Sequence, residues 1–150
     1  MRKAALLRII VLMSAGLAAA SASAESTGTA AEAKAMLDRA IVEVKADLPA
    51  AIVKFNDPKG SFRDRDLYVF CASATDGLLT AHPKLVGTDL RTIKDKNDKP
   101  FGKEMFDSAR EGEIGEVTYV WPRPDATEPV EKVSYIIKVS GQICGVGYYK

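Results

Sequence analysis

The hydrophobic pattern of the chain changes once, from a helical period to a strand period, and this limits the folds that it can form. Between about residues 30 and 55 apolar positions recur every three or four residues, which predicts a long helix with one apolar face. These positions are Leu37, Ile41, Val44, Leu48, Ile52 and Phe55. Pro49 removes a backbone donor inside this helix, so we expect a kink or a division into two helices.

After residue 66, short runs of β-forming residues alternate with turn sequences. We expect five strands, at residues 67–72, 78–81, 117–121, 130–139 and 142–149. A long loop over residues 82–100 and a short helix over residues 101–110 separate the second strand from the third. A long helix followed by a five-stranded antiparallel sheet is an α+β fold. The long loop is a candidate functional segment, because idle loops of that length are uncommon in a compact domain.

The start of the chain has the three parts of a secretory signal peptide. A basic start is followed by an apolar run over residues 9–20 and by small residues at Ala22 and Ala24. An uncleaved membrane anchor is the alternative, but the apolar run is shorter than the roughly 20 residues that a spanning helix needs. We therefore expect a signal peptide over residues 1–24, cleavage after Ala24, and one periplasmic domain over residues 25–150.

Removal of this segment changes the net charge. The 150 residues contain 21 Lys and Arg against 20 Asp and Glu, a formal net charge of +1. Arg2, Lys3 and Arg8 leave with the signal peptide, so the mature chain has 18 basic and 20 acidic residues and a net charge of −2. A nucleic-acid-binding domain would need a strong basic excess, and this class is therefore excluded.

The two cysteines lie in the first and last expected strands. In an oxidising compartment two such cysteines usually pair. A bond between Cys71 and Cys144 on neighbouring antiparallel strands would place Val69 opposite Val146, on an apolar face suited to the long helix. Two buried thiols remain the alternative.

The other face of these strands would carry Tyr68 and Phe70 beside Gly145 and Gly147. Aromatic walls around glycines, which lack side chains, are typical of a small-molecule pocket. Glycines that mark a bulge or a close helix approach are an equal alternative.

The chain has little of the chemistry that an enzyme needs. Its one histidine is His82, both cysteines lie in apolar strand patterns where thiols are usually inert, and no glycine-rich phosphate loop is present. The acidic residues lack the spacing of a calcium loop. We expect no catalytic residue, no cofactor and no metal site.

A series of motifs resembles, in order and spacing, the single Cache domain, type 2 family, over nearly the whole mature chain. The motifs include Phe55-Asn56-Asp57-Pro58-Lys59-Gly60-Ser61-Phe62, Asp66-Leu67-Tyr68-Val69-Phe70, Ala81-His82-Pro83, Lys99-Pro100-Phe101, Trp121-Pro122, Lys132-Val133-Ser134-Tyr135 and a Gly-x-Gly-Tyr-Tyr-Lys ending at Lys150.

This resemblance implies a PAS-like fold, in which a long N-terminal helix and a five-stranded antiparallel sheet enclose a ligand pocket on one sheet face. Such domains usually serve as sensors of chemoreceptors and histidine kinases, and they bind organic acids or amino-acid-like molecules. We expect a non-catalytic extracytoplasmic sensor domain for a small anionic metabolite. The chain ends at its last expected strand, so we also expect a free-standing domain that does not itself carry a signal across the membrane.

The candidate ligand-binding residues are aromatic or can carry positive charge. They are Tyr68, His82, Arg91, Lys103, Tyr119, Trp121 and Tyr135. His82 matches a pocket-side motif of the family and could donate to a carboxylate, and Arg91 and Lys103 could supply the charge that an acid needs. The alternatives are a structural role for His82 in fixing the loop, core packing for the aromatic residues, and a solvated surface for the two cations.

A different function is an interaction module that binds no ligand. Such a domain would dock on a membrane receptor or kinase, or form a homodimer through the long helix. An apolar helix stripe wider than the sheet can cover would favour this function.

Overall fold

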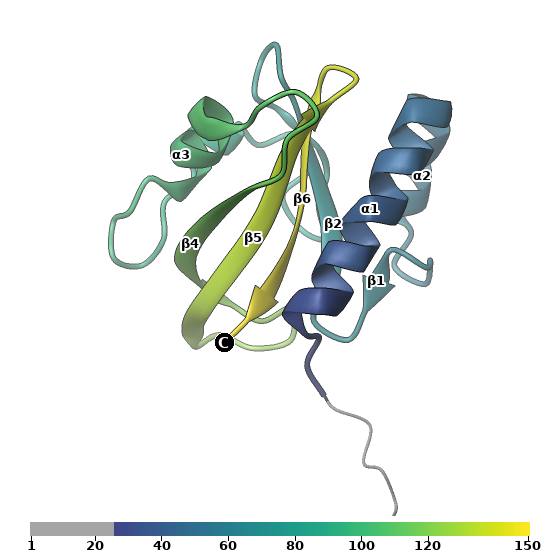
Figure 1. The fold of residues 1–150 in the computed structure, drawn as a ribbon. Helices are drawn as coiled ribbons and strands as arrows, with labels where there is room; N and C mark the ends of the chain where they lie inside the picture. The colour runs from purple at the N-terminus through teal and green to yellow at the C-terminus, as the bar shows by residue number, and fades with distance from the viewer. Residues whose placement is uncertain (1–25) are drawn as a thin grey trace, which may run out of the picture.

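A computed structural model describes residues 26–150, which form two helical layers around one antiparallel sheet (Figure 1). Helices α1 (Ala30–Ala46) and α2 (Leu48–Asn56) lie on one side of the sheet, and α3 (Phe101–Ser108) lies on the other. The strands are β1 (Arg63–Asp64), β2 (Leu67–Ser73), β3 (Leu79–Ala81), β4 (Gly115–Pro122), β5 (Pro129–Val139) and β6 (Gln142–Tyr149), and a 3-10 turn, η1, spans Leu90–Thr92.

The expected signal peptide lies outside the described residues, so its cleavage after Ala24 stays a prediction. Within residues 26–150, no helix has the length and apolar character needed to cross a membrane.

The long helix divides in two where Pro49 predicted a kink or a division. Asp47 ends α1 and begins α2, and its side chain accepts a hydrogen bond from the backbone N–H of Ala50 at 3.0 Å. Pro49 then falls in the first turn of α2, where its missing donor costs nothing. In the apolar stripe Leu37, Val44 and Phe55 are buried and the other three residues are half-buried. The large apolar side chains left exposed on the two helices are Val42 and Val53. Dimerisation through the helices stays a prediction.

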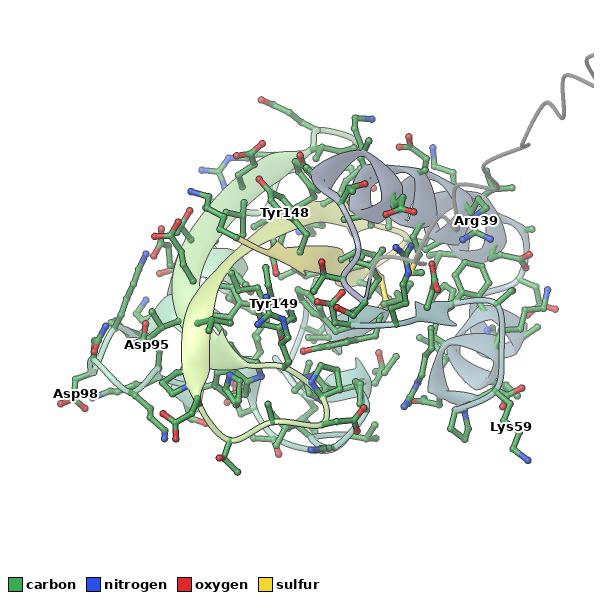
Figure 2. All side chains as sticks on the ribbon, turned by 90° about the horizontal axis from the view of Figure 1, so that it is seen from below. Arg39, Lys59, Asp95, Asp98, Tyr148 and Tyr149 are labelled. Carbon is green, nitrogen blue, oxygen red and sulfur yellow. A yellow bond between two sulfur atoms is a disulfide. The ribbon has the colours of Figure 1, made fainter. Side chains whose placement is uncertain are left out.

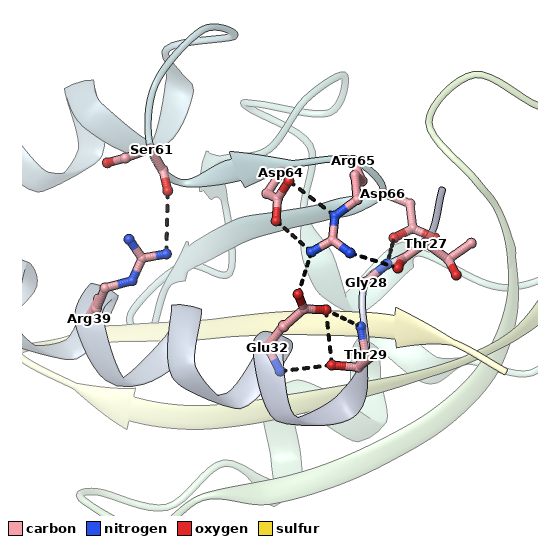
Figure 3. Close-up of polar contacts among 9 residues, drawn as sticks. All are labelled: Thr27, Gly28, Thr29, Glu32, Arg39, Ser61, Asp64, Arg65 and Asp66. Atoms are coloured by element: carbon pink, nitrogen blue, oxygen red, sulfur yellow. Dashed lines mark hydrogen bonds and ion pairs between the residues drawn. The ribbon is translucent and has the colours of Figure 1, made fainter. Parts of the chain in front are cut away.

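A polar cluster fixes the N-terminus of α1 over the β1–β2 turn (Figure 3). Arg65 forms ion pairs with Asp64 and Glu32, each at 2.7 Å, and donates to the carbonyl of Thr27. Arg65, followed by the capping contacts of Thr29, lowers the pKa of Glu32 to about 2. The cluster holds the segment before α1 against the edge of the sheet.

The sheet order is β1-β2-β6-β5-β4, with β3 also paired to β2. The predicted register is confirmed, because Val69 lies opposite Val146 and Cys71 opposite Cys144, and the two cysteines form a disulfide. The predicted count of five strands is wrong. The sheet has a sixth strand, β1, whose two residues are too few to show a periodic pattern.

The two faces of the sheet carry separate cores. Figure 2 shows Tyr148 and Tyr149 on opposite sides of β6, as strand alternation requires. Tyr148 packs with the core under α1 and α2, which contains Val69 and the disulfide. The second core, under α3 and η1, contains Tyr68 and Phe70 and lies next to the cavities described below.

Candidate ligand-binding site

A cavity of about 100 Å³ opens where the residues after β3 meet the end of β4. Its lining residues are Tyr68, His82, Pro83, Lys84, Leu85, Trp121, Pro122, Arg123 and Pro124. Lys84 Nζ donates to the carbonyl of Pro124 at 2.9 Å, so one hydrogen bond joins the two loops around it. A smaller cavity of about 20 Å³ shares His82, Leu85 and Trp121, and the rest of its lining is apolar.

His82 both fixes its own loop and presents a donor. Its Nδ1 accepts hydrogen bonds from the backbone N–H groups of Lys84 at 3.0 Å and Leu85 at 3.2 Å. Burial, and then the positive charges of Lys132, Arg63 and Lys84, lower the pKa of His82 to about 3. The imidazole is therefore neutral at pH 7, and because Nδ1 is an acceptor its proton is on Nε2. Nε2–H makes no hydrogen bond within residues 26–150 and is free to donate to a ligand.

Lys132 on β5 is fully buried, and its ammonium lies behind Tyr68. Nζ donates to the hydroxyls of Tyr68 at 2.9 Å and Tyr149 at 3.3 Å, and lies 4.1 Å and 4.6 Å from the two ring centroids. No carboxylate of residues 26–150 forms an ion pair with it, and burial lowers its pKa to about 7. The charge of Asp66 acts in the opposite direction but does not offset the burial. A buried cation without an ion pair is costly, so a functional reason is expected.

The strand glycines make room for this arrangement. A Cβ on Gly147 would lie 2.4 Å from Cε of Lys132, and a Cβ on Gly145 would lie 2.5 Å from Cζ of Phe70. Both glycines share the face of Tyr68, as predicted, but the interpretation of an open glycine floor is wrong. Side chains of the protein fill the space, and the cavity lies farther along, beside Tyr68.

Arg123 completes the wall after β4. Its Nε lies 3.3 Å from Oδ2 of Asp66, and its guanidinium lies 5.0 Å from the ring centroid of Tyr149. Asp66 is buried and also accepts a hydrogen bond from the backbone of Gly28, so its charge is already engaged. The lining of the 100 Å³ cavity contains two cations and, within the described chain, no acidic side chain. Its electrostatic potential therefore favours an anion.

The structure brings three of the seven predicted site residues together, because Tyr68, His82 and Trp121 line the cavity. Tyr119 lies behind them, stacked on Phe101 at 4.0 Å between centroids, with its hydroxyl 2.9 Å from Oγ of Ser134. It is a core residue of the α3 side.

The other three predicted residues lie outside the cavity. Tyr135 points to the opposite face of the sheet and packs on Tyr148. Arg91 pairs with Asp89 at 2.7 Å, and Lys103 forms an exposed ion pair one helical turn along α3. Both cations are partnered at the surface, which is the alternative that sequence analysis left open for them.

Sequence reasoning missed Lys132 and Arg123. A signal for Lys132 was present, since β5 alternates Lys132, Ser134 and Ile136 on one face with apolar residues on the other. The middle of β5, Lys132 to Ser134, is covered on both faces, so even the lysine there is buried. No local pattern marks Arg123, which follows β4 in a proline-rich turn. Within residues 26–150, no group of three His, Cys, Asp or Glu residues could hold a metal ion.

The helices and the antiparallel sheet form the α+β fold of Cache and other PAS-like domains. The chain belongs to the single Cache domain 2 family, whose model matches residues 17–148. It is similar to the crystal structure of a methyl-accepting chemotaxis protein from Vibrio parahaemolyticus, with a TM-score of 0.65 and 22% identity over 79% of this chain and 86% of that chain. It is also similar to the periplasmic sensor domain of a chemotaxis protein, with a TM-score of 0.60 and 24% identity over 79% and 88% of the two chains.

Two further relatives have higher sequence identity. One is a Cache chemosensory domain solved to explain carboxylic acid recognition, with 27% identity, a TM-score of 0.59 and coverage of 79% of this chain and 86% of that chain. The other is the methyl-accepting chemotaxis protein McpP of Pseudomonas putida, 45% identical over 71 residues. That match covers 46% of this chain and 13% of the receptor.

Proposed function

We propose that residues 25–150 form a non-catalytic periplasmic sensor domain that binds a short organic acid in the 100 Å³ cavity. The observation that carries the proposal is a lining with two cations, a neutral histidine with a free Nε2–H, and no acidic side chain among the described residues. An interaction module without a ligand has less support, because the large apolar side chains that α1 and α2 leave exposed are only Val42 and Val53.

The ligand carboxylate would accept from Nε2–H of His82 and from the hydroxyl of Tyr68. The Tyr68 hydroxyl accepts from the Lys132 ammonium, which leaves its own proton free to donate and makes it a stronger donor. The cavity volume of about 100 Å³ equals that of about three water molecules, and an acid of only a few non-hydrogen atoms would fit it. No side chain in the lining pairs with His82 as a nucleophile, and this supports binding without catalysis.

The relatives support the same proposal. A Cache domain with 27% identity was solved for carboxylic acid recognition, and McpP is a chemotaxis receptor. We propose that the partner of this domain is a membrane receptor or kinase.

Calorimetric titration and thermal unfolding with acetate, propionate and butyrate test the function, and neutral propionamide is the ligand control. A bound acid at 100 times its Kd should stabilise the protein by about 2.7 kcal/mol. Tyr68→Phe should weaken binding at least tenfold, whereas the matched variant Tyr148→Phe, on the other sheet face, should leave it unchanged. The proposal fails if no acid binds at millimolar concentration, or if propionamide binds as well as propionate.

A further inference from the structure

A second hollow adjoins the cavity on the side of β1. It is a polar cleft of about 300 Å³, and it shares Tyr68, Pro83 and Pro124 with the 100 Å³ cavity. A molecule too long for the cavity would therefore extend past these three residues into the cleft. One charged group of the cleft has a buried donor without a partner among residues 26–150, and this group determines what part of a ligand the cleft can take.

That group is Arg63, which lies on β1 directly opposite Tyr68 in the sheet register. Its Nε is the one buried side-chain nitrogen or oxygen that lacks a hydrogen-bond partner among residues 26–150. Within this part of the chain Arg63 also forms no ion pair, whereas its neighbour Arg65 pairs with both Asp64 and Glu32. Buried donors are nearly always satisfied, so the guanidinium of Arg63 is short of an acceptor, and the same side chain lines the cleft in which a ligand would lie.

Neither acidic residue of the cleft forms an ion pair with Arg63. Asp64 is held by Arg65 at 2.7 Å, and the other acid, Asp125, is exposed on the turn after β4 and forms no ion pair within the described residues. On the cavity side, Lys84 and Lys132 have no carboxylate partner within residues 26–150, and Arg63 is close enough to act on His82. Within the described residues, the lining of each hollow therefore contains one cation without an ion pair, Lys84 in the cavity and Arg63 in the cleft.

We propose that Arg63 binds a second acidic group, so that the preferred ligand is a dicarboxylate with one carboxylate in the cavity and the other in the cleft. The planar guanidinium suits this role, because it donates to a carboxylate through two parallel N–H groups. This inference rests on the proposed carboxylate site beside Tyr68 and His82, and it adds the length and charge of the ligand.

The test compares acids of equal carbon number, succinate with butyrate and malonate with propionate, by calorimetric titration of the whole protein. The wild type should bind each dicarboxylate at least tenfold more tightly than its monocarboxylate, since a charge-assisted contact is worth about that factor or more. Arg63→Gln should remove this preference and leave the monocarboxylate Kd within about twofold, whereas Arg39→Gln, on α1, should change neither.

Three results would overturn the inference. The wild type could bind both acids of a pair equally, or Arg63→Gln could weaken both acids by the same factor. Asp125→Asn could also weaken dicarboxylate binding, although loss of a nearby acid should preserve or strengthen it. With monocarboxylate binding intact, the first result refutes the role of Arg63 and leaves the proposed function standing. Absence of binding by every acid would instead refute the proposed function.

Discussion

The cost of burying the Lys132 charge can be measured as a change in the pH dependence of unfolding. Burial lowers the pKa of this lysine from 10.5 to about 7, so between these values the folded protein binds fewer protons than the unfolded chain. The free energy of unfolding must therefore rise with pH in this window. The buried charge lowers the free energy of unfolding by about 4 kcal/mol at pH 7 and by about 2 kcal/mol at pH 9. We therefore predict that the free energy of unfolding rises by about 2 kcal/mol between these two pH values.

Lys132→Met removes the charge and keeps a side chain of similar length. At pH 7 the free energy of unfolding should rise by the roughly 4 kcal/mol that the buried charge costs. It should also fall by about 1–3 kcal/mol, because the buried hydroxyl of Tyr68 then lacks its hydrogen-bond partner. We therefore expect the variant to be about 1–3 kcal/mol more stable than the wild type at pH 7, with this advantage gone near pH 9.

Urea unfolding at pH 7, 8 and 9 measures these differences, and Lys138→Met on the same strand is the matched control. His82 and Tyr68 do not interfere, because burial lowers the pKa of the histidine to about 3 and raises that of the tyrosine above its usual value. A variant that is less stable than the wild type at pH 7, or that follows the same pH dependence, would show that the buried ammonium costs nothing.

Three other perturbations test the disulfide, the histidine and the strand glycines. Reduction of the disulfide Cys71–Cys144, which spans 73 residues, should lower the free energy of unfolding in urea by about 4 kcal/mol. Equal stability with and without reductant would argue against the bond. His82→Asn keeps an acceptor for the loop N–H groups, so it should unfold near the wild-type temperature but bind acids weakly. His82→Ala should lose both stability and acid binding. Full acid binding by His82→Asn would exclude the histidine from the site. Gly147→Ala should destabilise by about 1–3 kcal/mol through overpacking against Lys132, and Gly115→Ala, which meets only an ordinary contact, is its control in thermal unfolding.

Much of the scaffold could be predicted because its determinants are local. The division of the helix at Pro49 does not depend on what the helix packs against. In the same way, strand alternation places Tyr68 and Val69 on opposite faces of the sheet, independently of what covers each face. The cysteine pair then set the register of β2 against β6, because one cross-strand contact determines all the others in a ladder.

The candidate site could be predicted only in part, for the same reason. Tyr68, His82 and Trp121 stand beside turns or strand ends that local patterns mark, and they line the cavity. Arg91 and Lys103 were equally suitable by residue type, but each has a carboxylate partner at the surface. Both partners are local, since Asp89 lies two residues before Arg91 and Asp107 lies four residues after Lys103, so the sequence did carry a signal that these two cations are paired.

The sequence by itself therefore determined the order of helices and strands, the register of the first and last long strands, and the side of the sheet on which a pocket could form. Only the tertiary structure decided which charges lie without partners. Within residues 26–150 neither Lys132 nor Arg63 forms an ion pair, and Lys132 is buried against Tyr68 and Tyr149, which come from other strands. Burial is a property of long-range packing, whereas periodicity, turn chemistry and ion pairs within one helical turn belong to the local chain.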